Sequence, residues 1–123
     1  MAKKIMVVDD EENVLELVKA ILEKEKFSVI TARSGKECLE LLKKVKPDLI
    51  LMDLMMPVMT GKDTTKKIRE NPKTKDIKII FLTVARLSEV GIAEIEKLNV
   101  LDYITKPFDN EDLVKRVKRA IGE

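Results

Sequence analysis

The chain has 123 residues, a length that fits one domain with a single shared core. Lysine and arginine number 24 against 22 acids, and aromatic residues make up only 3%, so nucleic-acid binding, which needs a basic stripe with aromatic platforms, gains little support. Histidine is absent and Cys38 is the sole cysteine, which excludes histidine-based chemistry, a disulfide within the chain and a cysteine–histidine metal site.

The predicted elements begin with a short apolar strand at Ile5–Val8. A helix follows, because apolar residues recur at the i, i+3, i+4, i+7 spacing of one buried helix face. Its predicted stripe is Val14, Leu17, Val18 and Ile21. The second strand is Val29–Ala32, and Ser34 with Glu37 forms a capping box that opens a second helix. Pro47 closes this helix, whose predicted stripe is Cys38, Leu41, Leu42 and Val45.

The middle of the chain continues the alternation of strand and helix. A third strand is predicted at Leu49–Met52, and a third helix near Thr64–Glu70 is closed by Pro72. The fourth strand is Ile77–Leu82. These runs lack alternating polarity, which is typical of strands buried on both faces of a sheet.

The last third of the chain completes the pattern. A fourth helix is predicted near Leu87–Leu98, and Asn99 follows it where a left-handed residue is often needed. The fifth strand is Val100–Ile104, and Asp109 is the expected N-cap of the last helix. The buried stripe of that helix is Leu113, Val117, Ala120 and Ile121. Buried strands joined by helices predict an α/β fold, with a parallel sheet covered on both faces.

Polar side chains follow several of the predicted strands directly. Asp9 and Asp10 follow the first strand, Asp53 the third, Thr83 the fourth and Lys106 the fifth. In open parallel sheets, ligands bind outside the carboxyl ends of the strands, so these residues are candidates for one site. If the first and third strands are neighbours, the three carboxylates converge and repel one another unless a cation is present. Their oxygen ligands suit Mg²⁺ better than zinc or calcium.

Lys106 and Thr83 indicate which ligand would bind beside the cation. They offer a positive charge and a hydroxyl donor to the same pocket, and such a pocket fits a phosphoryl group. A phosphoryl passing to an Asp53 oxygen develops charge that the cation and Lys106 stabilise. The sequence therefore predicts that Asp53 is a nucleophile that forms an acyl phosphate.

Each residue also has a simpler interpretation when taken alone. Acids near a helix start are commonly N-terminal signals, Asp53 is equally a turn residue, and Lys106 is equally a solvated lysine. Thr83 is equally a strand residue. Tyr103, taken alone, is a core or interface aromatic, and this interpretation stays open beside any functional role. The joint placement of the polar residues at separate strand ends favours a single site.

Four motifs then occur in order, namely VVDDEE, LILMDLMMPVMTG, FLTVA and DYITKPF. Together they resemble the receiver domain of bacterial and archaeal response regulators over almost the whole chain. The resemblance implies a flavodoxin-like, doubly wound fold with a five-stranded parallel sheet in the order 2-1-3-4-5, five helices and three αβα layers. It also implies that residues 1–123 form a single receiver domain with no output domain.

The resemblance assigns a role to each site residue. Mg²⁺, or Mn²⁺ in its place, is implied to bind directly to Asp10, Asp53 and the backbone carbonyl of Met55, and to Asp9 through water. Asp53 would be the phosphoacceptor. Lys106 would pair with the phosphoryl oxygens, and the Lys106-Pro107 bond is expected to be cis. Thr83 and Tyr103 would form a switch that remodels the face of the fourth helix, fifth strand and fifth helix.

The resulting hypothesis is a stand-alone response regulator in the cytoplasm, which is a signalling phosphoacceptor and not an enzyme. A sensor histidine kinase or a histidine phosphotransfer protein would donate the phosphoryl group, and an unidentified downstream protein would receive the signal. We expect a monomer or weak homodimer with neither nucleic acid nor membrane as partner. The alternative is a pseudo-receiver that is never phosphorylated, but such modules typically lack an acid or the lysine, and this chain lacks none.

Overall fold

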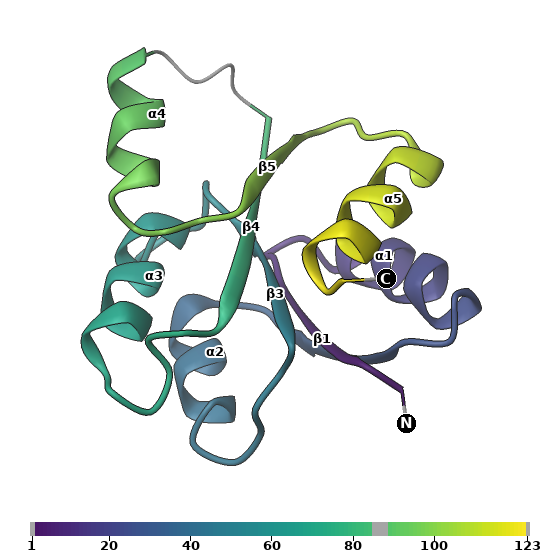
Figure 1. Ribbon diagram of the computed structural model, residues 1–123, viewed down its shortest axis with the longest axis horizontal. Coiled ribbons are helices and arrows are strands. Elements are labelled where there is room, and N and C mark those ends of the chain that lie inside the picture. The colour runs from purple at the N-terminus through teal and green to yellow at the C-terminus, as the bar shows by residue number, and fades with distance from the viewer. Residues whose placement is uncertain (1, 85–88, 123) are drawn as a thin grey trace.

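Figure 1 shows the computed structural model, which describes residues 2–84 and 89–122. Within these residues, five parallel strands form one sheet in the order β2-β1-β3-β4-β5, as the sequence predicts. The strands are β1 Lys4–Val8, β2 Ser28–Ala32, β3 Leu49–Asp53, β4 Lys78–Thr83 and β5 Asp102–Thr105. The order reverses between β1 and β3, so the carboxyl ends of these two strands flank the point where ligands bind in such sheets.

Helices cover both faces of the sheet and complete three layers (Figure 1). The helices are α1 Glu12–Lys24, α2 Gly35–Leu41, α3 Gly61–Glu70, α4 Glu89–Glu96 and α5 Asn110–Ala120. Helices α1 and α5 lie on one face, and α2, α3 and α4 lie on the other. None of the described helices is long and apolar enough to cross a bilayer.

Strand β3 lies between the two halves of the core and is buried along its whole length. Leu49 and Leu51 join the cluster under α1 and α5, whereas Ile50 and Met52 join the cluster under α2, α3 and α4. Successive side chains of a strand point to opposite faces, so a strand between two helical layers is apolar at every position. The run of apolar residues before Asp53 therefore has a structural explanation.

The buried face of α1 differs from the predicted stripe. Leu15, Val18 and Leu22 are buried, whereas the predicted core residue Leu17 is 48% exposed. The other two predicted positions, Val14 and Ile21, are partly buried. Helix α1 contacts both the sheet and α5, so two neighbours together determine which of its side chains are buried. The prediction from periodicity alone was shifted from the observed buried face by about one residue.

Helix α2 begins as predicted and ends earlier. The Ser34 hydroxyl accepts a hydrogen bond from the Glu37 amide at 3.0 Å, and the Glu37 carboxylate accepts one from the Arg33 amide at 3.2 Å. The helix ends at Leu41, and the amides of residues 43 and 44 donate to carbonyls three residues earlier, a tighter turn. Val45, which was predicted to lie on the buried face of this helix, therefore packs on the core from the segment after it. The prediction that Pro47 ends the helix is wrong.

Polar residues mark several of the remaining helix ends. Helix α3 starts at Gly61, three residues before the prediction, because the Thr60 hydroxyl caps it by accepting from the Asp63 amide at 3.1 Å. Asn99 has the expected left-handed backbone, with φ of 57°. Asp109 caps α5 as predicted.

Two predicted segments of the last third differ at their ends. Strand β5 begins two residues after the predicted start. The predicted fourth helix started at Leu87, and positions 87 and 88 lie outside the described residues. In the described part, α4 ends two residues before the predicted Leu98.

Candidate functional site

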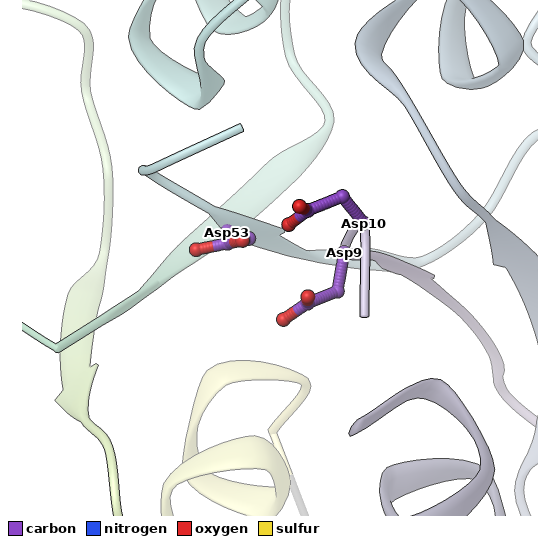
Figure 2. A group of neighbouring side chains, drawn as sticks. All are labelled: Asp9, Asp10 and Asp53. Carbon is purple, nitrogen blue, oxygen red and sulfur yellow. The ribbon is translucent and has the colours of Figure 1, made fainter. Parts of the chain in front are cut away.

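The carboxylates of Asp9, Asp10 and Asp53, which we call the acid cluster, come together at the carboxyl edge of the sheet. Val8 of β1 pairs with Met52 of β3, so the residues that follow them, Asp9 and Asp53, lie side by side. Figure 2 shows the three side chains converging, and one oxygen of each lies within 4.8 Å of the others. Asp9 and Asp53 are buried and Asp10 is exposed, so the cluster opens to solvent on one side.

Lys106 supplies a positive charge beside the acid cluster. Its Nζ lies 2.6 Å from Asp9 Oδ2 and 3.6 Å from Asp53 Oδ1, and its side chain is only 10% exposed. The Lys106 amide donates to the Thr83 carbonyl at 2.7 Å, which fixes the loop after β5 against the end of β4. The Lys106-Pro107 peptide is cis, as the sequence resemblance implies. The sequence thus predicted correctly that Lys106 faces the acids.

Two of the carboxylates are held by the chain that follows them. Asp9 Oδ1 accepts a hydrogen bond from the Glu11 amide at 2.9 Å, and Asp53 Oδ1 accepts one from the Met55 amide at 3.2 Å. Both are side-chain turns in which an aspartate bonds the amide two residues on. These bonds orient both carboxylates at the edge of the sheet.

Gly61 is a positioning residue whose role the sequence did not reveal. A Cβ at this position would lie 2.1 Å from the Asp53 carbonyl oxygen, so the first turn of α3 presses directly on the end of β3. The Gly61 amide donates to the Leu54 carbonyl at 3.1 Å. Only glycine permits this approach. Gly61 belongs to a recognised motif, but a close backbone contact depends on tertiary structure and leaves no periodic signal.

Burial and charge shift the pKa values of Asp53 and Lys106. Burial raises the pKa of Asp53 to about 6, and the negative charge of Asp9 adds to the rise, while Lys106 opposes it. Burial acts to lower the pKa of Lys106, but its hydrogen bond to Asp9 and the charges of Asp9 and Asp53 outweigh burial, so that pKa lies above its ordinary value. Three carboxylates therefore share one ammonium, and negative charge remains uncompensated.

The residues present fit a divalent cation. The donors are carboxylate oxygens, which hard cations such as Mg²⁺ prefer. The pKa of Asp53 is raised first by burial and then by the charge of Asp9, and a bound cation would oppose both effects. Among the described residues, the acid cluster is the group of three acidic, histidine or cysteine residues that meets this geometry. The predicted fourth ligand, the Met55 carbonyl, stays a prediction.

Thr83 and Tyr103 lie on the sheet face that α4 covers. Thr83 ends β4, next to Leu82, the partner of Asp53 in the sheet, and it is buried. Tyr103 pairs with Phe81, two residues before Thr83, so side-chain alternation places all three on one face. Tyr103 is 39% exposed, which contradicts a buried core role, and its role as a switch stays a prediction.

Comparison with known proteins places this geometry in context. Residues 5–118 match the family described as the response regulator receiver domain, a stretch that includes the acid cluster and Lys106. The chain is 40% identical to a CheY-like response regulator receiver domain protein of Methanospirillum hungatei, with a TM-score of 0.87 over 98% of this chain and 94% of that one.

Two further structures extend the likeness. The chemotaxis protein CheY4 of Vibrio cholerae is 31% identical, with a TM-score of 0.92, over 98% of this chain and 99% of that one. The receiver domain of the sensor histidine kinase PA1611 of Pseudomonas aeruginosa is 26% identical, with a TM-score of 0.88, over the full length of both chains. The latter structure has a magnesium ion coordinated in its active site cleft.

Proposed function

The chain belongs to the response regulator receiver domain family, and from this premise we propose that Asp53 accepts a phosphoryl group and thereby switches a protein-binding surface. The observation that carries the proposal is the convergence of Asp9, Asp10 and Asp53 beside Lys106 at the carboxyl edge of the sheet. Receiver domains partner with histidine kinases, so we assign the donor as a phosphohistidine on a sensor histidine kinase or a histidine phosphotransfer protein.

The proposed metal ligands are Asp9, Asp10, Asp53 and the Met55 carbonyl. Bound Mg²⁺, or Mn²⁺ in its place, would supply positive charge that offsets the charge on the phosphoryl oxygens. Asp9 and Asp10 follow β1 and Asp53 ends β3, so these carboxylates would hold the cation next to the proposed phosphoacceptor. Mg²⁺ usually keeps several waters, which agrees with a cluster exposed on the Asp10 side.

Asp53 is suited to nucleophilic attack on phosphorus. A pKa of about 6 leaves its carboxylate mostly ionised at neutral pH. In the proposed step, an Asp53 oxygen forms a bond to phosphorus as the bond between phosphorus and the donor imidazole nitrogen breaks, and the nitrogen keeps the electron pair. Lys106 lies 3.6 Å from Asp53 and is placed to pair with the transferred phosphoryl oxygens. Water later hydrolyses the acyl phosphate.

Thr83 and Tyr103 are proposed to carry the change outward. Thr83 follows Leu82, the strand partner of Asp53, and this position supports a role in which its hydroxyl donates to a phosphoryl oxygen. Tyr103 shares its sheet face and is partly exposed, so it is free to respond on the surface formed by α4, β5 and α5. In this proposal residues 1–123 act as one cytoplasmic receiver unit, a phosphoacceptor that acts on no separate substrate, and a downstream protein reads that surface.

The decisive test is incubation with a small phosphodonor such as acetyl phosphate, with and without Mg²⁺. We expect intact-protein mass spectrometry to detect one added phosphoryl group only when Mg²⁺ is present. Asp53→Asn is expected to abolish the addition, because an amide cannot form an acyl phosphate. Asp63→Asn, which removes an exposed acid on α3, serves as the matched control and should be modified like the wild type.

Either of two results would refute the proposal. One is a phosphoryl addition that persists in Asp53→Asn, which would move the acceptor to another residue. The other is a wild-type protein that binds Mg²⁺ yet accepts no phosphoryl group from the small donor or from a phosphorylated histidine phosphotransfer protein. That outcome would indicate an inert interaction module.

A further inference from the structure

Two adjoining hollows lie at the edge of the sheet opposite the acid cluster. A cavity of about 540 Å³ is lined by the ends of α2 and α3 and by the loop that precedes β4. A second cavity, of about 230 Å³, shares with it four lining residues: Leu42, Lys43, Lys73 and Thr74. The lining segments lead into the amino ends of β3 and β4, whereas Asp53 ends β3 (Figure 1).

The lining of these hollows is strongly basic, and we call the feature the lysine groove. Its five lysines are Lys43, Lys44, Lys46, Lys67 and Lys73, all exposed. Of the residues that line it, only Glu70 is acidic. Within the described part of the chain, Lys43 is the one member with an ion pair, 3.5 Å from the exposed Glu40, and such surface pairs contribute little.

The basic character of the groove is not shared by the rest of the chain. Residues 36–78 carry eleven lysines and arginines against seven acids, whereas the remaining residues carry thirteen against fifteen. The small net charge of +2 therefore conceals a separation of charge along the chain, and five of these eleven cations line the groove. A positive concave surface raises the local concentration of anionic partners and accelerates their association.

The wall of the groove is held in place before any partner arrives. Arg69 Nη1 donates to the carbonyls of Lys75 and Ile77, each at 2.7 Å, and the Thr74 hydroxyl donates to the Ile68 carbonyl at 2.7 Å. These bonds fix the loop between α3 and β4. A preformed binding surface loses little conformational entropy when it is occupied.

The floor of the groove is apolar. Leu39 and Leu42 are partly buried and pack on the core cluster under α2, α3 and α4, and Val45 does the same beneath the smaller hollow. The groove thus combines a cationic rim with an aliphatic floor. Its occupant should therefore carry both negative charges and at least one apolar side chain.

We propose that the lysine groove binds an acidic protein segment that anchors an aliphatic side chain between α2 and α3. Nucleic acid is disfavoured because the lining has neither arginine nor an aromatic side chain for base stacking. A membrane surface is disfavoured because a concave floor cannot reach into a bilayer as an exposed amphipathic helix does. Charge and shape complementarity point to a peptide.

The test uses a fluorescein-labelled peptide of repeating Glu-Glu-Leu units, with a peptide of repeating Glu-Glu-Ser units as the comparison. We expect fluorescence anisotropy to show saturable binding of the leucine peptide, weakened by added salt, and weaker binding of the serine peptide. The combined change Lys43→Glu, Lys67→Glu and Lys73→Glu should weaken binding by about tenfold or more. Amide NMR shifts on peptide addition should concentrate at residues 39–46 and 67–77.

The matched control reverses three exposed lysines elsewhere, Lys3, Lys19 and Lys115, and should bind like the wild type. The proposal is wrong if the leucine peptide does not bind at low salt or if the control variant loses binding equally. It is also wrong if single-stranded RNA or vesicles of anionic lipid bind the groove more tightly than the peptide. Asp53→Asn should bind the peptide normally, so failure here is independent of the phosphoacceptor proposal.

Discussion

Asp53 is the residue at which function and stability oppose each other. Its carboxylate is buried next to Asp9, and its pKa is raised from 3.8 to about 6. A raised carboxylate pKa means that the folded state prefers the protonated form. The negative charge on Asp53 therefore destabilises the fold above about pH 6, and the penalty vanishes below the ordinary pKa, where the folded and unfolded states are both protonated.

We expect Asp53→Asn to stabilise the metal-free protein at neutral and alkaline pH. The change removes the charge and keeps an oxygen that accepts from the Met55 amide. The free energy of unfolding should rise by roughly 1 to 3 kcal/mol above about pH 7, and the gain should shrink as the pH falls from about 6 to about 4. Urea unfolding in the presence of a chelator, repeated across this pH range, measures the effect.

The exposed Asp63 provides the comparison, since Asp63→Asn should show no such pH-dependent gain. A metal-free Asp53→Asn protein that is less stable than the wild type at alkaline pH would contradict this account. It would mean that Lys106 overcompensates the acid cluster.

Val58 is a residue with a strained backbone. Its φ is 68°, a left-handed backbone that β-branched residues rarely adopt, and its side chain is fully exposed and makes no core contact. Val58→Asn should raise the free energy of unfolding by about 1 kcal/mol, because asparagine tolerates this backbone. Thermal unfolding measures the change. The control is Lys66→Asn, at an exposed position with ordinary helical backbone. A fall in stability for Val58→Asn would refute the strain argument.

The acid cluster was predictable because its residues lie at or just after the ends of apolar strands, and parallel strands bring such positions to one edge. Asp9, Asp53 and Lys106 needed only the strand order to be placed together. Gly61 was not predictable in the same way, because its role depends on a backbone contact with the Asp53 carbonyl, and such contacts have no sequence spacing. A role that depends on where a residue lies along the chain can thus be predicted from the sequence. A role that depends on a close contact in the folded protein cannot.

At the scale of elements, Arg69 links three segments that are distant in sequence. From α3 it donates to the carbonyls of Lys75 and Ile77 before β4, and to those of Leu98 and Asn99 after α4. Burial lowers its pKa, with the charge of Asp76 opposing the change. One guanidinium therefore satisfies four carbonyls, which an ammonium cannot match in number or geometry.

We expect Arg69→Lys to loosen the connections on both sides of β4. Loss of several charge-assisted hydrogen bonds should lower the free energy of unfolding by about 2 kcal/mol or more. Amide hydrogen exchange should accelerate in residues 71–77 and 98–101. As a control, Arg119→Lys on the exposed side of α5 should change neither quantity. Unchanged exchange in these two segments would show that Arg69 does not hold them.

The elements themselves followed from the sequence to different degrees. The strands were predictable because burial on both faces makes them uniformly apolar, and the order of strands and helices was correct throughout. The buried face of α1 was predicted wrongly at Leu17, because contact with α5 rotates it, and the end of α2 was misplaced because a tight turn precedes Pro47. Whether a segment is a strand or a helix thus follows from its local sequence pattern. Which face of a helix is buried, and where the helix ends, depends on the elements packed against it.

At the scale of the whole molecule, Lys106 joins the ends of three strands, since it follows β5 and contacts acids that follow β1 and end β3. Removing the ammonium leaves Asp9, which is fully buried, without its cation. We expect Lys106→Met to lower the free energy of unfolding of the metal-free protein by about 3 kcal/mol. Mg²⁺ binding should persist, while phosphorylation by acetyl phosphate should slow markedly.

The partly exposed pair of Lys118 on α5 with Glu25, which directly follows α1, is the natural control, with 2.8 Å between the charged atoms. Lys118→Met should cost less than about 1 kcal/mol, because surface ion pairs contribute little. Differential scanning calorimetry with a chelator, and then with Mg²⁺, separates the two variants. Loss of Mg²⁺ binding in Lys106→Met would show that Lys106 organises the metal ligands rather than the phosphoryl group.

The contact between Lys106 and Asp9 has a physiological consequence. The ammonium of Lys106 offsets part of the negative charge of the acid cluster without any ion from the surrounding medium. If the proposed function holds, a shortage of magnesium should therefore leave the protein folded but unable to accept a phosphoryl group. Renewed magnesium should restore that ability at once, without new synthesis or refolding.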